Sequence, residues 1–439
     1  MLVLFLYFCC AQDRTRTCTA LRPLPPESSA STISPLGHFG VGVKIALTKN
    51  DANFASFNKK SNSFRMKIAF DGKRAVKNGT GLGNYSRYVL ESLCKHADAN
   101  DKFIVYSPKG RMNAWMQRII DTFAPQISLV INCSIFASVW RTFGMTQDAE
   151  KDGAVIFHGL SNELPLNIAK SKMKSVVTIH DLIFRRMPEC YKFIDRKIYD
   201  YKFRKAAENS DVVIAVSERT KKDIVELYHI DAEKIRVVYQ GCDAQFAKEI
   251  SEDEKIRVAQ KYDLPERYIL NVGSIETRKN ALQIVRALKD VDVSVSLVIV
   301  GRRTKYAEKI DEYVKKNGLD ARIKIISGID FKDLPAVYAQ AEVFVYPSFY
   351  EGFGIPIVEA LNVGVPVIAA TGSCLEEAGG ASSIYVDPTN DKEMSDAVNR
   401  VLTDPDLRAK MIVDGKEYAK RFSEEQCAKE IFEIYREII

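Results

Sequence analysis

A short segment that follows a predicted strand carries the residue types that bind phosphate. The apolar run Val343–Tyr346 indicates a strand, and the loop after it contains Glu351-Gly-Phe-Gly354. Pro356 suits the first turn of a helix, and Gly364 suits the end of that helix. Because the free N–H groups and the dipole at a helix N-terminus attract anions, this strand-loop-helix pattern predicts a phosphate site.

The two glutamates of this segment have different predicted roles. Glu351 lies on the loop, where it is placed to meet a sugar. Glu359 is expected in the first turn of the helix, where its carboxylate can accept hydrogen bonds from vicinal hydroxyls such as those of a ribose. The alternative is an ordinary strand-to-helix turn with two solvated acids. The combination of strand, glycines, proline and spacing argues against that alternative.

A second loop, again directly after a predicted strand, carries two adjacent cations. The segment Asn271–Asn280 contains Arg278 and Lys279. Fixed cations stabilise the negative charge that builds up on a diphosphate leaving group; arginine binds phosphate with two hydrogen bonds, and lysine acts as a point charge. An isolated Arg-Lys pair is otherwise typical of a solvated turn. Arg302 or Arg303, after the next strand, is a candidate for a further cation, and a surface role fits equally well.

A glycine-rich stretch near the start of the first predicted domain opens a helix. Its glycines, Gly79, Gly81 and Gly83, follow a G-x-G-x-G pattern some residues after the first strand. A dinucleotide-binding fingerprint needs G-x-G-x-x-G immediately after that strand, so the pattern does not favour a nicotinamide cofactor. We expect Asn84 and Tyr85 to cap and pack the helix.

His180 stands at the end of another apolar strand, in Thr178-Ile-His180-Asp181. A histidine at that end of a parallel strand faces the ligand-binding edge of the sheet, where it can bond a sugar hydroxyl, and a structural histidine is the alternative. A metal-dependent phosphohydrolase needs further ligands, which five histidines hardly supply. Asp290-Val-Asp292 looks like a D-x-D metal motif, but it lies between strands, and chance explains it better.

The elements that must position these residues alternate as strands and helices over 439 residues, a length that fits two α/β domains. The expected strands of the first half are Lys67–Phe70, Phe103–Tyr106, Ser128–Ile131, Ala154–His158, Ser175–Ile179, Val212–Val216 and Ile235–Tyr239. Those of the second half are Tyr268–Val272, Ser296–Val300, Ile323–Ile326, Val343–Tyr346, Val365–Ala369 and Ile384–Val386. Two Rossmann-like domains with a ligand cleft between them follow from this order.

The domain boundaries follow from changes in this pattern. Residues 1–65 contain a proline-rich and a Ser/Thr-rich stretch, and the strand pattern starts at Met66. We interpret 1–65 as an unstructured extension or upstream sequence from an over-extended gene, with a targeting leader as the alternative. We then expect an acceptor-side domain at 66–250, a nucleotide-sugar domain at 251–422 and a terminal helix at 423–439 that begins with the capping box Ser423–Gln426.

Composition narrows the class of protein further. The chain is 46% hydrophobic and 27% charged, and its formal net charge of +6 is spread without a basic stripe, which does not favour nucleic acid as a partner. The nine cysteines have no secretory spacing, so reduced thiols in the cytoplasm are expected. No apolar run reaches the roughly 18–20 residues of a membrane helix. The basic helix Asp195–Lys205 could touch an anionic membrane, although a solvated face is the simpler interpretation.

The segment PSFYEGFGIPIVEALNVGVPVI resembles the hallmark of glycosyltransferase family 4, a group of retaining enzymes with the two-domain GT-B fold, and the resemblance runs from Met66 to the C-terminus. It implies that Glu351 contacts the donor sugar and Glu359 the ribose, while the main chain of Gly352–Ile355 faces the diphosphate. Family members commonly have an arginine where this chain has Ser274.

The resemblance assigns the remaining site residues too. Lys279 matches a lysine of the family's cation loop, and Arg278 matches a branch of the family that contains an RKN sequence. His180 would approach the donor sugar near its anomeric carbon. Gly81 and Gly83 would lie in a loop that closes over the donor phosphates and borders the acceptor.

These assignments imply a reaction and its rivals. A retaining hexosyltransferase would move a sugar from a UDP-sugar or GDP-sugar to a glycan or lipid-linked acceptor in cell-surface polysaccharide synthesis, without a cofactor or metal. Substitution would occur on the front face, with the leaving diphosphate helping to deprotonate the acceptor hydroxyl. The alternatives are a GT-B-fold nucleotide-sugar 2-epimerase and a non-catalytic protein that binds sugar nucleotides. We expect the enzyme in the cytoplasm, with peripheral contact at the inner face of the membrane.

Overall fold

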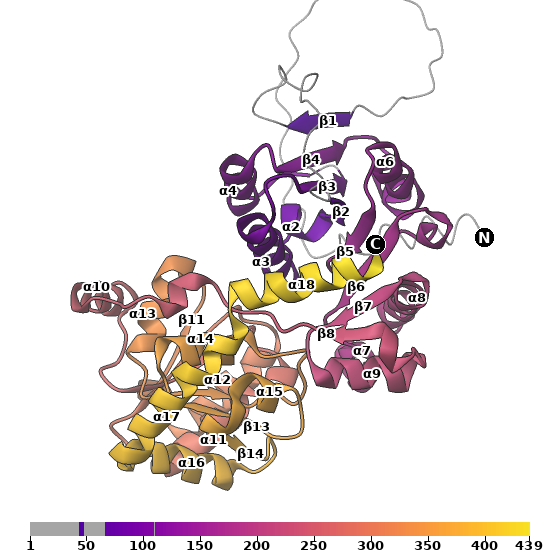
Figure 1. The fold of residues 1–439 in the computed structure, drawn as a ribbon. Helices are drawn as coiled ribbons and strands as arrows, with labels where there is room; N and C mark the ends of the chain where they lie inside the picture. Colours follow the sequence, from indigo (N-terminus) through magenta and orange to yellow (C-terminus); the bar gives the residue numbers. More distant parts are fainter. Residues whose placement is uncertain (1–43, 48–65, 109) are drawn as a thin grey trace, which may run out of the picture. The chain divides into compact units, whose positions relative to one another are not determined.

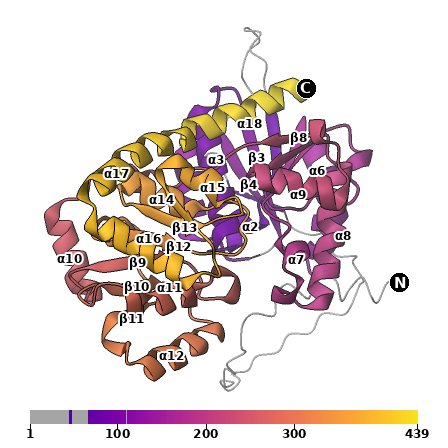
Figure 2. The same ribbon diagram turned by 90° about the horizontal axis from the view of Figure 1, so that it is seen from below.

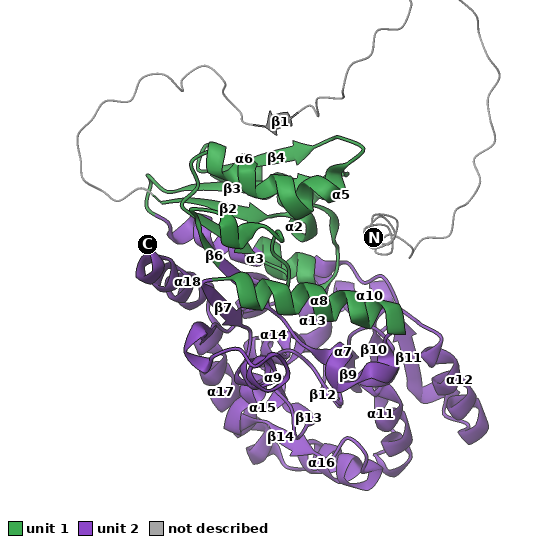
Figure 3. Cartoon of the chain, turned by 90° about the vertical axis from the view of Figure 1, so that its right-hand side faces the viewer, with its two compact units in different colours: residues 1–87, 98–175, 193–210 green, residues 88–97, 176–192, 211–439 purple. Residues whose placement is uncertain are grey.

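The structure, a computed structural model, describes residues 44–47, 66–108 and 110–439. The described chain divides into two compact units (Figure 3). Unit 1 comprises the residues up to Arg87 together with 98–175 and 193–210, and unit 2 comprises 88–97, 176–192 and 211–439. Each unit is built on parallel strands with helices between them (Figure 1). Among the described residues, no helix combines the length and apolar character needed to cross a membrane.

Unit 1 contains a sheet in which the strands follow the order β1-β4-β3-β2-β5. The strands β2 to β5 pair in parallel, as expected for strands joined by helical crossovers, whereas β1 pairs antiparallel with β4. The strands are β1 (Lys44–Leu47), β2 (Lys67–Asp71), β3 (Lys102–Pro108), β4 (Ile127–Asn132) and β5 (Ile156–Gly159). The main helices are α2 (Lys73–Lys77), the first part of α3 (Gly81–His96), α4 (Ala114–Phe123), α5 (Ala137–Val139), the π-helix Trp140–Gly144, α6 (Met145–Lys151) and α8 (Phe193–Asn209).

Unit 2 contains two groups of strands, and most of β6 belongs to the first of them. β6 (Lys174–Ile179), β7 (Val212–Ala215) and β8 (Ile235–Val237) are parallel neighbours in that order. A six-stranded parallel sheet follows the order β11-β10-β9-β12-β13-β14. Its strands are β9 (Tyr268–Val272), β10 (Ser296–Val300), β11 (Ile323–Ile326), β12 (Val343–Tyr346), β13 (Val367–Ala370) and β14 (Ile384–Val386).

Several helices of unit 2 pack on the six-stranded sheet, whereas α9 packs on β7 and β8. Helices α11 and α16 pack against each other (Figure 2). Their bounds are α7 (Ile183–Arg186), α9 (Glu218–Tyr228), α10 (Glu252–Tyr262), α11 (Ala281–Ala287), α12 (Tyr306–Asn317), α13 (Leu334–Ala339), α14 (Ile355–Val363), α15 (Leu375–Gly379), α16 (Asp391–Thr403), α17 (Pro405–Ala419) and α18 (Glu424–Ile438). Buried aliphatic side chains from β9, β10 and β12 form a core with those of α11, α12 and α16.

The expected strands all form, and their ends move by a few residues at most. The twelfth expected strand, Val365–Ala369, is an example of the two-residue shifts, because it begins at Val367. Ser423 caps its helix as expected, and Ser251 caps α10 in the same way; each side chain accepts a hydrogen bond from a main-chain N–H three residues on. Gly364 ends α14 in the left-handed region, with φ of 92°.

Three observations add to or change the sequence-based expectations. Lys44–Leu47 forms β1, although no strand is expected before Met66; the rest of 1–65 lies outside the described residues. Glu359 is the fifth residue of α14, so its prediction in the first turn is wrong, because that helix begins at Ile355. Helix α18 reaches the second half of α3, where Lys95 pairs with Glu424 at 2.9 Å.

The central position of β9 makes its side chains a direct test of the packing on the six-stranded sheet. Leu270 is fully buried in β9, between β10 and β12. We expect Leu270→Ala to lower the free energy of unfolding by about 2–5 kcal/mol, because it removes buried methyl groups and leaves a cavity. Val293→Ala, at a side chain that is 79% exposed, is the control and should change the free energy by about 0.5 kcal/mol or less. Equal effects in urea denaturation would contradict the described packing.

Candidate functional site

The loop between β12 and α14 holds Glu351 in a buried polar pocket within unit 2. One carboxylate oxygen of Glu351 accepts hydrogen bonds from the Lys279 ammonium, the Tyr346 hydroxyl and the Ser348 hydroxyl, each at 3.0 Å. The other oxygen pairs with the Arg278 guanidinium at 2.6 Å. The predicted sugar-contacting glutamate and the predicted phosphate-binding cations are therefore in direct contact.

Two connections tie the cation loop to the glutamate loop. The short 3-10 helix Thr277–Lys279 presents Arg278 and Lys279, and it ends at Asn280, which has a positive φ of 54°. Arg278 donates to the main-chain carbonyl of Tyr350 at 2.6 Å, and its own carbonyl accepts from the Phe349 N–H at 2.9 Å. The two loops thus hold each other in place through main-chain as well as side-chain bonds.

The charges in this pocket determine which groups stay ionised. Burial acts to raise the pKa of Glu351, but Lys279 and then Arg278 outweigh burial and lower that pKa to about 2. Glu351 in turn raises the pKa of both cations above their ordinary values, against the effect of their own burial. The largely buried part of the cluster is two cations on one carboxylate, while the more exposed Glu276 also pairs with Arg278 at 3.0 Å. Both cations are charged donors of the kind that binds an anionic ligand.

The end of β6 lies directly against the glutamate loop. A Cβ atom on Gly352 would lie 2.0 Å from the carbonyl oxygen of His180, so this close approach requires glycine. The carbonyl of His180 also accepts from the Thr220 hydroxyl at 3.2 Å, and the His180 side chain is only 8% exposed. The structure therefore brings the main chain of His180 together with the loop that carries Glu351.

The start of α14 follows the glycine loop as expected. Gly354 is the N-cap residue, and α14 runs from Ile355, with a proline in its first turn. The thiol of Cys374 donates to the main-chain carbonyls of Glu351 at 3.0 Å and Phe353 at 2.8 Å. Phe353 itself is buried against Tyr239 and Phe422, with ring centroids 5.5 and 5.4 Å away. The loop is thus fixed on both sides before the helix begins.

Glu359 belongs to a second buried group on the same helix. Its carboxylate accepts from the Tyr338 hydroxyl at 2.8 Å and is 9% exposed. Burial raises the pKa of Glu359 to about 8, and the hydrogen bond from Tyr338 offsets this only in part. The carboxyl group of Glu359 is therefore largely removed from water. A hydrogen bond from a ligand hydroxyl would offset part of the cost of that desolvation.

Gly81 and Gly83 lie in unit 1, at the start of α3. A Cβ atom on Gly83 would lie 2.0 Å from the carbonyl oxygen of Asn78, which gives this glycine a structural reason of its own. A Cβ atom on Gly81 would meet nothing within 4 Å. Asn84 lies inside the first turn and accepts from Arg87 at 2.7 Å, so the prediction that it caps the helix is wrong, whereas Tyr85 is buried as expected.

The weaker candidates are at exposed positions. Arg303 pairs with Asp311, and Arg302 is exposed. Asp292 accepts from the main-chain N–H of Ser294 at 2.9 Å, which is the role of a turn residue. Among the described residues, no group of three or more His, Cys, Asp or Glu side chains is arranged to hold a metal ion.

Sequence reasoning missed a charged cluster at the carboxyl ends of β2 and β5 in unit 1. Arg141 donates to Asp71 at 2.8 Å and to Glu163 at 2.7 Å, and Lys202 pairs with Glu163 at 3.2 Å. Burial, and then the charge of Arg141, lower the pKa of Lys73 to about 8. The one signal in the sequence was Asp71, directly after the first expected strand. Arg141 gave no signal, because it lies in a π-helix that no pattern predicts.

It also missed the partners of the predicted site residues. Tyr346, Ser348, Tyr338 and Cys374 all lie in or near the recognised segments, but their roles depend on three-dimensional contacts. A second missed group is Arg219 and Asp223 of α9, which both bind the hydroxyl of Tyr350. Tyr346, as the last residue of β12, could have been found from its position at the ligand-binding edge of the sheet.

Two protein-family models match consecutive parts of the chain. Residues 86–246 match the model described as "Glycosyltransferase Family 4", and residues 252–418 match the model described as "Glycosyl transferases group 1". The second match includes Arg278, Lys279, Glu351 and Glu359, and the first includes His180.

Two O-antigen mannosyltransferases resemble the chain over more than half of its length. The O-antigen chain mannosyltransferase B of Escherichia coli is 30% identical over 287 residues, which cover 64% of this chain and 74% of that protein. The O-antigen chain mannosyltransferase RfbU of Salmonella typhimurium is 28% identical over 230 residues, or 52% of this chain and 61% of its own.

Two solved structures share the fold. Anabaena HepE, crystallised with UDP and glucose, superposes with a TM-score of 0.67 and 18% identity, covering 85% of this chain and all of HepE. WaaG, a glycosyltransferase involved in lipopolysaccharide biosynthesis, superposes with a TM-score of 0.62 and 16% identity over 84% of this chain and 99% of its own. With the family matches and the O-antigen relatives, these findings show that the chain belongs to glycosyltransferase family 4 and is a retaining glycosyltransferase with the GT-B fold.

Proposed function

We propose that this enzyme moves a hexose from a nucleoside-diphosphate sugar to a glycan or lipid-linked acceptor in the synthesis of a cell-surface polysaccharide. The observation that carries the proposal is the cluster of Glu351, Arg278 and Lys279, which combines a sugar-binding carboxylate with two cations for a diphosphate. The O-antigen mannosyltransferases among its relatives support the acceptor class, and HepE with UDP-glucose supports the donor class.

Donor binding would change the partners inside this cluster. The diphosphate competes with Glu351 for Arg278 and Lys279, because phosphate oxygens and carboxylate oxygens bind the same donors. Glu351 then has oxygen atoms available for hydroxyls of the sugar. As the bond to the sugar breaks, the cations stabilise the growing charge on the leaving diphosphate, and the diphosphate accepts the proton of the incoming hydroxyl on the same face.

The other predicted residues have supporting roles in this proposal. The main chain of Gly352, Phe353, Gly354 and Ile355 faces the diphosphate at the start of α14, and Glu359 accepts from the ribose hydroxyls. His180 bonds the donor sugar near its anomeric carbon. Gly81 and Gly83 border the donor phosphates and the acceptor.

The proposed reaction needs no metal ion, because Arg278, Lys279 and the N-terminus of α14 supply the positive charge that a divalent cation would otherwise provide. In this proposal the acceptor-side domain is 66–250 and the donor-side domain is 251–422.

The enzyme is further proposed to work in the cytoplasm, peripherally on the inner face of an anionic membrane. Helix α8 supports this contact, because its buried side holds Ile198 and Phe203 while Phe193, Ile194 and Tyr201 are 63%, 67% and 49% exposed. Two cations, Arg196 and Lys197, lie over the Phe193 ring at 5.5 and 5.6 Å from its centroid. Exposed apolar side chains beside basic ones fit an anionic lipid surface.

Substitution of the cluster tests the proposed chemistry. We expect Glu351→Ala and Lys279→Ala each to lower turnover by about 100-fold or more, since each removes a group that acts in the transition state. The measurement is release of nucleoside diphosphate from candidate nucleotide sugars, with and without acceptor, in EDTA. Turnover in EDTA should equal that with Mg²⁺.

A matched control separates chemistry from folding in that assay. Glu342 is also a half-buried glutamate held by two cations, Arg267 and Arg408, and Glu342→Ala should leave turnover within about twofold. Near-normal activity of both cluster variants would reject the site. An epimerised donor without release of nucleoside diphosphate would indicate the 2-epimerase alternative, and binding without either product would indicate a non-catalytic protein.

The raised pKa of Glu359 gives a test with a defined sign. The folded protein favours the protonated carboxyl, so Glu359 contributes stability that is complete below the ordinary pKa of 4.5 and is lost as the pH rises through about 8. Glu359→Gln does not titrate, and it should therefore raise the melting temperature over wild type at pH 9 by about 3 °C or more, with little difference at pH 4.5. It should also weaken nucleoside-diphosphate binding. A variant with unchanged affinity would remove Glu359 from the ribose site.

Vesicle binding tests the proposed membrane contact. The double substitution Phe193→Ser and Ile194→Ser should weaken binding to phosphatidylglycerol vesicles about tenfold or more, because it removes the apolar area that would enter the interface. Cosedimentation with phosphatidylglycerol and with phosphatidylcholine vesicles provides the measurement. Val413→Ser, at a side chain of similar exposure (67%), is the control. Unchanged binding of the double variant, or no binding of the wild type to either vesicle, would contradict the contact.

A further inference from the structure

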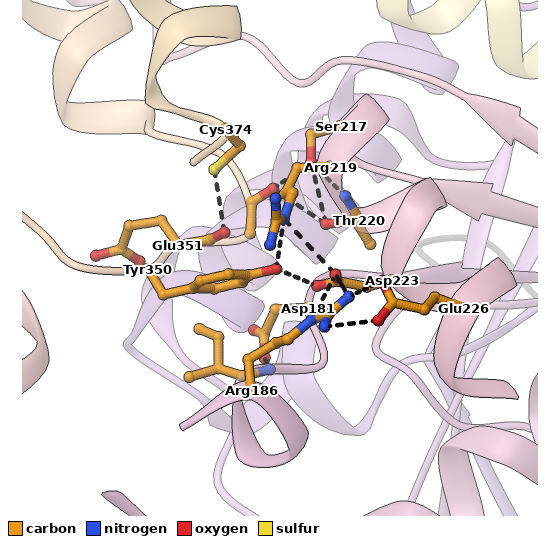
Figure 4. Close-up of polar contacts among 12 residues, drawn as sticks. Asp181, Arg186, Ser217, Arg219, Thr220, Asp223, Glu226, Tyr350, Glu351 and Cys374 are labelled. Atoms are coloured by element: carbon orange, nitrogen blue, oxygen red, sulfur yellow. Dashed lines mark hydrogen bonds and ion pairs between the residues drawn. The ribbon is translucent and has the colours of Figure 1, made fainter. Parts of the chain in front are cut away.

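The residue immediately before Glu351 makes an unusual set of contacts within unit 2. Tyr350 is 8% exposed, and its hydroxyl donates to the carboxylate of Asp223 on α9 (Figure 4). The Nε atom of Arg219, one turn earlier on α9, donates to the same hydroxyl oxygen at 2.7 Å. The guanidinium of Arg219 also lies 5.0 Å from the centroid of the Tyr350 ring. The side chain of Tyr350 is thus bound on its hydroxyl and on its face.

Asp223 is itself fixed from a second element. Its side chain is 1% exposed, and Arg186 at the end of α7 donates to it through Nε at 2.9 Å and pairs through Nη2 at 2.8 Å. Arg186 also holds Glu226 on the exposed side of α9. A buried carboxylate that is bound by a guanidinium in this two-pronged way has one defined orientation, so it gives Tyr350 a fixed point of attachment.

The main chain on both sides of Glu351 is held as well. The carbonyl of Tyr350 accepts from Arg278 at 2.6 Å, and the carbonyl of Gly352 accepts from the Ser217 hydroxyl at 2.6 Å and the Thr220 hydroxyl at 3.2 Å. Ser217 is the N-cap residue of α9, and Thr220 lies in its first turn. Helix α9 therefore binds the residues directly before and after Glu351.

The hydroxyl of Tyr350 remains protonated and able to donate. Burial raises its pKa above the ordinary range, and the hydrogen bond to Asp223 raises it further. The contact is therefore a hydrogen bond from a neutral phenol to the side-chain oxygen of Asp223, and replacing tyrosine by phenylalanine removes that bond while the ring remains.

We propose that Tyr350 and Asp223 are positioning residues for the transfer reaction, which orient Glu351 and Arg278 through the buried Tyr350–Asp223 hydrogen bond. This inference rests on the proposed function of Glu351 at the donor sugar. Since Tyr350 adjoins Glu351 in the chain and accepts from Arg278, a shift of its backbone moves both groups. Glu359 of α14 is bonded to Tyr338 of α13, and this contact does not involve Tyr350.

The first experiment separates turnover from donor binding. Tyr350→Phe and Asp223→Asn should each lower kcat about 10- to 100-fold, because small displacements of a reacting group are costly in the transition state. The KM for the donor should stay within about threefold, since the ribose and the main-chain phosphate contacts remain. A wild-type kcat in Tyr350→Phe would overturn the inference, and so would a loss confined to KM.

A double-substitution cycle tests whether Tyr350 acts through Glu351. In a Glu351→Gln background, the further change Tyr350→Phe should lower kcat by clearly less than it does in the wild type, because one of the two groups that it positions is already altered. The same full loss in both backgrounds would show that Tyr350 acts elsewhere and would overturn the inference. If Glu351→Gln alone kept wild-type activity, the proposed function of the site would fail first, so the two failures are distinguishable.

A matched tyrosine controls for general stability. Tyr262 also donates to a buried carboxylate, Asp333, at 3.0 Å, and Lys261 and Arg257 pair with the same carboxylate. Tyr262→Phe should therefore cause a similar small loss in melting temperature with kcat unchanged. Equal losses of kcat in Tyr262→Phe and Tyr350→Phe would mean that stability alone explains the effect. Should Asp223→Asn fail to fold, Tyr350→Phe still decides the question.

Discussion

The pairing of one buried carboxylate with two cations is the constraint on which the rest of the site depends. Glu351, Arg278 and Lys279 are each largely buried, and each would be costly to leave alone in that environment. Their mutual attraction keeps all three ionised and fixes the two loops that carry them. The protein thereby keeps in place the two largely buried cations that are proposed to bind the diphosphate, which is the preorganisation that electrostatic stabilisation of a leaving group requires.

The fold places this cluster at the carboxyl ends of neighbouring strands. Lys279 and Arg278 follow β9, and Glu351 follows β12, which pairs with β9 in the six-stranded sheet. Parallel pairing brings these two loops to the same edge, and the hydrogen bond from Arg278 to the Tyr350 carbonyl locks them together. The end of β6 and the start of α9 add a third side through His180, Ser217 and Thr220. Segments far apart in the sequence therefore share one rigid group of loops.

The sequence alone predicted thirteen strands that form, although it missed β1 and the π-helix, and it named candidate site residues that the structure brings into contact. Strands were found because each is a β-branched, apolar run that ends at glycine or polar residues, and the glycine loop was found because proline and glycine mark the start and end of α14. The position of Glu359 was misjudged by part of a turn, since helix starts are poorly marked. The Tyr350–Asp223 contact joins residues 127 positions apart, and no local pattern announces such a bond. The raised pKa of Glu359 likewise depends on burial by α13.

The central claim is that Glu351 holds the two cations until a diphosphate takes its place, and calorimetric titration with nucleoside diphosphate tests it most directly. Glu351→Gln removes the competing negative charge and leaves Arg278 and Lys279 in the site. The account predicts that this variant binds nucleoside diphosphate about threefold more tightly or better than wild type at low salt, with the difference shrinking as salt is added. Equal or weaker binding by the variant would contradict the account.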